Sequence, residues 1–76
     1  MGNNIPLIFL REGSNGVIEN LNGGEKFSRK LMEMGLNKGS EFKIIRNDVG
    51  PVILRYGETR LVIAKGMAQK IMVREV

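Results

Sequence analysis

The side chains of this sequence that could do chemistry are carboxylates, hydroxyls and cationic groups, because neither histidine nor cysteine occurs. Those two residue types supply the commonest general base and the commonest transition-metal ligands. The eight carboxylates are widely spaced, and no two of them form the short acidic patterns typical of cation-binding loops. The hydroxyl residues have no base partner nearby in the sequence. The sequence therefore predicts no catalytic residue, no metal ligand and no cofactor, and favours a binding protein over an enzyme.

The formal net charge of +4 raises nucleic-acid binding as an alternative function. Apart from the adjacent Arg29 and Lys30, however, the basic residues are spread singly and interleave with acidic ones, as on a solvated surface. The phenylalanines all fit core positions and are expected to be large core fillers: Phe9, Phe27 and Phe42. Only Tyr56 is then left to stack on bases, which makes nucleic acid the less favoured partner.

The longest apolar run, residues 7–10, is far too short to cross a bilayer, and the first residues lack the basic region of a signal peptide. We therefore expect a cytoplasmic protein that does not insert directly into the membrane. The 76 residues predict a single domain over residues 1–76, with residues 1–6 disordered or loosely attached.

One predicted helix should position Arg29 and Lys30. Over residues 25–34 the apolar side chains Phe27, Leu31 and Met34 recur at helical spacing and indicate the face that packs on the core. Gly35 is suited to the left-handed conformation that ends a helix, and Leu36 would then fold back on Leu31, as in a Schellman cap. The sequence predicts a positive φ at Gly35.

Short strands should form the remainder, because turn residues recur at regular intervals. We expect strands at residues 16–21, 42–46 and 71–73, a hairpin pairing 52–54 with 61–63 around residues 56–59, and a second helical turn at 66–69. Several strands are apolar on both faces, so the helix and residues 7–10 must cover part of the outer face. The outward side chains of Ile53 and Met72 are candidates for an uncovered binding patch.

The order of these segments resembles the FeoA family. Residues 30–39, KLMEMGLNKG, are similar to its helix-and-turn signature, which makes Leu31, Gly35, Leu36 and Gly39 the expected structural positions. Residues 16–18, 50–52, 60–63 and 68–73 resemble its first strand, central turn and closing segments. The resemblance covers about residues 7–76; one difference is Lys30, where the family often has arginine.

The resemblance implies a mainly β, SH3-like barrel and a cytoplasmic accessory role beside FeoB, the membrane ferrous iron transporter with a GTPase domain. It implies no catalytic or iron-binding residue in this chain. The same barrel occurs as the C-terminal domain of iron-dependent repressors, and a stand-alone relative of that domain is a further alternative. Self-association is left open as a second mode of interaction.

The outer side of the predicted helix is the first candidate docking surface, because interfaces pair apolar anchors with polar edges and are enriched in arginine and methionine. Its residues would be Lys26, Arg29, Lys30 and Met32. The alternative is that Met32 packs under residues 7–10 and the basic side chains are merely solvated. In that case Ile53 and Met72 become the next candidates.

Overall fold

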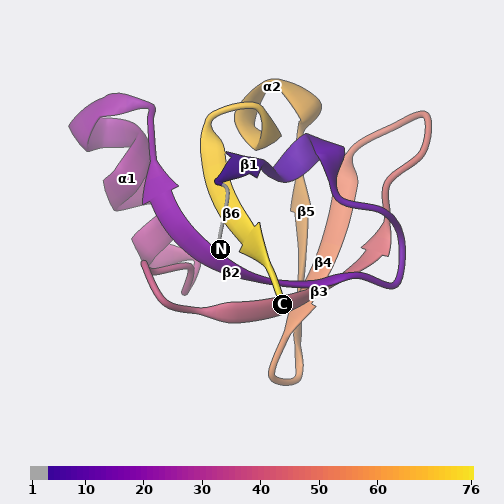
Figure 1. Ribbon diagram of the computed structural model, residues 1–76. Coiled ribbons are helices and arrows are strands. Elements are labelled where there is room, and N and C mark those ends of the chain that lie inside the picture. Colours follow the sequence, from indigo (N-terminus) through magenta and orange to yellow (C-terminus); the bar gives the residue numbers. More distant parts are fainter. Residues whose placement is uncertain (1–3) are drawn as a thin grey trace.

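Antiparallel strands build most of the molecule, as the computed structural model of residues 4–76 shows (Figure 1). They form one curled sheet in the order β1-β6-β2-β3-β4-β5. The elements in chain order are β1 (Ile5–Pro6), the 3-10 helix η1 (Leu7–Phe9), β2 (Asn15–Leu21), α1 (Gly24–Glu33), β3 (Glu41–Arg46), β4 (Val52–Tyr56), β5 (Thr59–Ile63), α2 (Lys65–Ala68) and β6 (Ile71–Glu75). The expected helix, hairpin, helical turn and strands are therefore confirmed within a few residues at their ends.

Alternating strand residues supply the core. In β3, β4 and β6 every second side chain is buried inside the curl, as the two-residue period of a strand requires. The fully enclosed residues are aliphatic: Leu7, Ile18, Leu31, Leu36, Ile44, Val52, Leu54, Ile63, Ile71 and Val73. No polar or charged residue among residues 4–76 is buried. The chemistry of this chain must therefore be sought on its surface.

A Schellman cap ends α1 as predicted. Gly35 has a φ of +98°, the Leu36 N–H donates to the Leu31 carbonyl at 2.9 Å, and the Gly35 N–H donates to the Met32 carbonyl at 2.9 Å. Leu31 and Leu36 are both fully buried, so their side chains provide the apolar contact of the cap. The helix end is specified by local sequence.

Helix α1 is also tied to the sheet at this point. The Tyr56 hydroxyl, at the end of β4, donates to the Met34 carbonyl at 2.6 Å. A Cβ atom added to Gly35 would overlap that hydroxyl oxygen, so the glycine is required by space as well as by φ. Gly39 also has a positive φ, of +93°, and its N–H donates to the Ile18 carbonyl at 2.7 Å, which returns the chain to β2.

The N-terminal segment is attached more firmly than expected. Ile5 and Pro6 were predicted to be disordered or loosely attached, but they form β1 and pair with Val73 and Met72 of β6. Residues 1–3 of that prediction lie outside the described residues. The strand is added because apolar Ile5 packs partly against the core and β6 offers a free edge to pair with.

Residues 7–10 were expected to cover part of the outer face of the sheet, whereas two of their side chains belong to the core. In a 3-10 turn, residues three apart lie on the same side, so Leu7 and Leu10 are buried while Phe9 is 70% exposed. The prediction that Phe9 fills the core is therefore wrong. The Asn47 side-chain amide fixes this segment by donating to the carbonyls of Ile8 at 2.8 Å and Leu10 at 2.6 Å.

Candidate protein-docking surfaces

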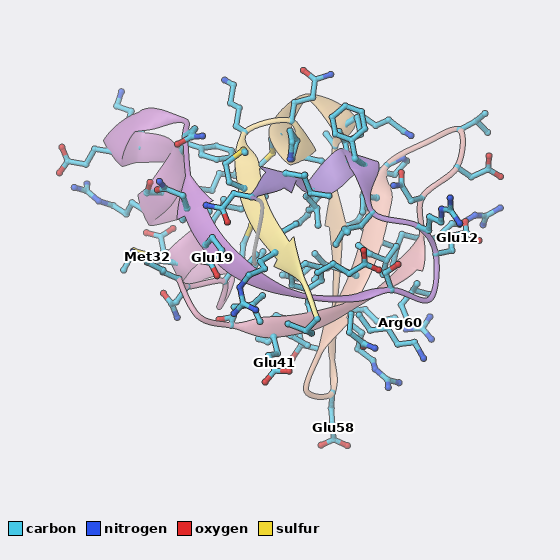
Figure 2. All side chains as sticks on the ribbon, in the orientation of Figure 1. Glu12, Glu19, Met32, Glu41, Glu58 and Arg60 are labelled. Atoms are coloured by element: carbon cyan, nitrogen blue, oxygen red, sulfur yellow. The ribbon has the colours of Figure 1, made fainter. Side chains whose placement is uncertain are left out.

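A surface on α1 surrounds the exposed methionine of the helix. Met32 is 57% exposed, so the alternative in which it packs under residues 7–10 is excluded. It borders an open hollow of about 450 Å³. We call this surface the helix face, and its residues are Glu25, Ser28, Arg29, Met32 and Glu33. Figure 2 shows Met32 pointing outward beside α1.

The charges of the helix face largely compensate one another. The Arg29 guanidinium lies 3.2 Å from the Glu25 carboxylate, one helical turn away. Lys26 and Lys30 were expected to extend this surface, but at 3.6 residues per turn they lie about 120° and about 160° around the helix from Met32. Both lysines are exposed elsewhere on α1. The structure thus brings Arg29 and Met32 together without the expected basic rim.

The other two predicted residues, Ile53 and Met72, lie on different strands. Met72 points outward from β6 between its paired neighbours Pro6 and Asn20 and is half-buried. Ile53 points outward from β4 and is also half-buried. The structure does not join them into one patch, because β2 and β3 separate their strands in the sheet.

Ile53 instead belongs to a second surface, which we call the sheet face. Directly opposite residues of antiparallel strands project from the same side of a sheet. Ile53 of β4 lies opposite Val62 of β5 and also opposite Arg46 of β3. In the same way, Arg55 of β4 lies opposite both Lys43 of β3 and Arg60 of β5. The sheet face consists of Lys43, Arg46, Ile53, Arg55, Arg60 and Val62.

Among residues 4–76, no acidic side chain lies within ion-pair distance of the cations of the sheet face. Within residues 4–76 the ion pairs are Arg29 with Glu25 and Arg74 with Glu19, and neither involves this surface. All four cationic residues of the sheet face are exposed. Figure 2 shows Arg60 near the projecting β4–β5 hairpin, well separated from Met32 across the molecule. The two surfaces are therefore distinct.

Sequence reasoning missed the cationic residues of the sheet face, although part of the signal was present. The predicted hairpin around residues 56–59 already places Arg55 opposite Arg60. Lys43 joins them through the pairing of β3 with β4, and an irregularity between Ile44 and Arg46 shifts that register. Such a bulge inserts a residue without a sequence signature, so the side of the sheet on which Arg46 lies could not be assigned.

Within the described part of the chain, no three acidic side chains gather closely enough to hold a metal ion. Over the same residues, 4–76, neither helix has the length and apolar character needed to cross a membrane.

Comparisons with known proteins find relatives over nearly the whole chain. The family model described as FeoA domain matches residues 5–75. A Methanocaldococcus jannaschii protein, provisionally named Fe(2+) transport protein A, is 39% identical over 70 residues, which cover 92% of this chain and 85% of that protein. A crystal structure described as an iron uptake regulatory protein (FeoA) matches with a TM-score of 0.89 at 33% identity, covering 97% of this chain and 100% of the other.

A more distant likeness extends to a manganese-dependent transcriptional repressor. It matches all of this chain, but only 44% of the repressor, with a TM-score of 0.87 at 15% identity. At that identity the likeness shows the fold alone. Together the two structures confirm the predicted SH3-like, mainly β fold.

Proposed function

Because this chain belongs to the FeoA family, we propose that it is a non-enzymatic accessory protein of ferrous iron uptake. In this proposal it acts in the cytoplasm by binding the cytoplasmic part of a FeoB-type transporter. The match to the family over residues 5–75 carries the proposal. The sequence adds support, since a chain without histidine and cysteine lacks the usual residues for acid–base catalysis and for binding iron.

Direct binding tests the proposal. The purified chain is titrated into the cytoplasmic part of its cognate transporter without nucleotide, with GDP and with a non-hydrolysable GTP analogue. We expect a saturable complex in at least one state. In cells, deletion of the gene should reduce ferrous iron uptake, and expression of the intact chain should restore it. Absence of binding in every nucleotide state, together with unimpaired uptake after deletion, would refute the proposal.

Nucleic-acid binding is the second candidate function, and the unpaired cations of the sheet face favour it. Its test is titration with single-stranded and duplex oligonucleotides across a salt series. Because phosphate contacts release counterions, the affinity of a functional nucleic-acid complex should fall steeply as salt is raised. The complex should still be detectable at about 0.15 M salt. Binding that disappears at that salt concentration would leave the protein partner as the favoured function.

A further inference from the structure

The sheet face holds like charges directly opposite one another. Lys43 pairs with Arg55 in β3 and β4, and Arg55 pairs with Arg60 in β4 and β5, so three cations cross three neighbouring strands in one row. Like charges in this position repel and destabilise a sheet. Natural sequences depart from such local rules mainly at functional sites. The row is therefore a surface that an external group of negative charge would complete.

An apolar strip adjoins the row on the same side of the sheet. Ile53 and Val62 are directly opposite each other, and Val62 is 61% exposed. Beside Ile53, the loop before β4 lines a mainly apolar hollow of about 200 Å³, with Val49 and Pro51 in its wall next to the charged Arg46 and Asp48. The space suits one aliphatic side chain of a partner. A row of charged residues beside an apolar hollow resembles a protein interface, in which a buried apolar side chain is surrounded by polar residues.

We propose that the sheet face binds an acidic segment of a protein partner, whose carboxylates lie on Lys43, Arg55 and Arg60 and whose apolar side chain enters the hollow beside Ile53. The inference rests on the proposed function, and it names the docking surface and the chemistry of the partner. Two of the three row residues are arginine, whose planar guanidinium binds carboxylates with two parallel hydrogen bonds.

A protein segment fits these observations better than nucleic acid. The face offers no aromatic ring for base stacking, because Phe42 is buried and Tyr56 is half-buried with its hydroxyl bound to Met34. The exposed Phe9 belongs to η1, whose most extensive contacts are with α2 and β6. Val62 and Val49 are exposed, at 61% and 88%, so binding to a lipid surface is one of the outcomes that the test distinguishes.

Charge reversal with a matched control tests the inference. The double variant Arg55→Glu/Arg60→Glu removes the row, and Lys26→Glu/Lys30→Glu changes net charge equally on α1. Val62→Ser removes an exposed valine of the face. Each is titrated with the transporter's cytoplasmic part and with the capped peptide EELEE, while amide chemical shifts map the contact. We expect the row variant to weaken binding at least about tenfold and the α1 variant less than about twofold.

The outcomes separate the inference from the proposed function. If the peptide shifts the sheet face but the transporter does not bind, the proposed partner is wrong and the inferred ligand chemistry stands. If the transporter binds equally to the row variant, the docking surface is elsewhere and the inference fails. It also fails if neither probe shifts the face, or if duplex DNA or phosphatidylserine vesicles bind the face more tightly than EELEE at about 0.15 M salt.

Discussion

The helix face and the sheet face carry charge in opposite ways. On the helix face, Arg29 pairs with Glu25 one turn away, and Glu33 borders the same hollow. On the sheet face, Lys43, Arg55 and Arg60 stand opposite one another with no ion pair. The first surface carries one arginine and two glutamates from a single helix, so its net charge is −1, while the second carries four cations from three strands.

The charges of the two surfaces act on local stability in opposite directions. An i,i+4 ion pair on an exposed helix contributes to stability and requires nothing from the rest of the fold. A row of like charges across strands opposes the pairing that creates it. The helix face is consistent with an ordinary solvated surface that supports its helix, whereas the sheet face is consistent with a surface kept for a ligand.

The largest expected effect compares how much a buried and an exposed residue of α1 contribute to the free energy of unfolding. Leu31 is fully buried and Met32 is 57% exposed, although they are adjacent in sequence. Leu31→Ala should lower the free energy of unfolding by about 2–5 kcal/mol, because it leaves a cavity in the core. Met32→Ala should lower it by less than about 1 kcal/mol. Urea denaturation measures both, and equal losses would show that Met32 belongs to the core.

The next effect tests the tie that holds the helix face in place. Gly35→Val should lower the free energy of unfolding by about 2–3 kcal/mol, because the left-handed φ strains a β-branched residue and the new side chain displaces the Tyr56 hydroxyl. Gly50→Val is the matched control, since nothing lies near an added Cβ there and its φ is not in the left-handed region. Thermal denaturation that shows similar losses for both would contradict the cap.

The smallest effect compares the two faces directly. Removing an arginine from each face should change the free energy of unfolding in opposite directions. Arg29→Gln removes an exposed ion pair and should destabilise the protein by about 0.3–0.5 kcal/mol. Arg55→Gln relieves repulsion on both sides and should stabilise it by about 0.2–0.5 kcal/mol. Both changes should shrink as salt is raised, because exposed charges are screened. A loss of stability in Arg55→Gln at low salt would show that the row is not repulsive.

Much of the fold was accessible from the sequence because it depends on local patterns. The apolar spacing of Phe27, Leu31 and Met34 indicates the helix and its inner face, and all three do pack on or in the core. Gly35 followed by Leu36 indicates the cap. The hairpin follows from apolar runs on either side of a short turn. Each of these signals lies within about ten residues of chain, where helix and turn geometry decide the outcome.

Contacts between distant segments were not accessible. Phe9 was expected in the core because it is apolar, and only the 3-10 turn of Leu7–Phe9 directs it outward. The attachment of that segment depends on Asn47, which lies 39 residues from Ile8 in the chain. No pattern of single residues predicts a polar side chain that bridges such a separation, because the geometry exists only after the sheet has formed.

For the candidate surfaces, the residue types on offer are fixed by composition. It contains no histidine or cysteine, has a net charge of +4, and carries a basic and methionine-containing helix. The helical period already separates Lys26 and Lys30 from Met32, and the hairpin already places Arg55 opposite Arg60. Only the pairing of β3 with β4 in the folded sheet aligned Lys43 with Arg55. The physical reason is that a helix sets its neighbours by a fixed local period, whereas a sheet sets them by register, which bulges and loops between strands control.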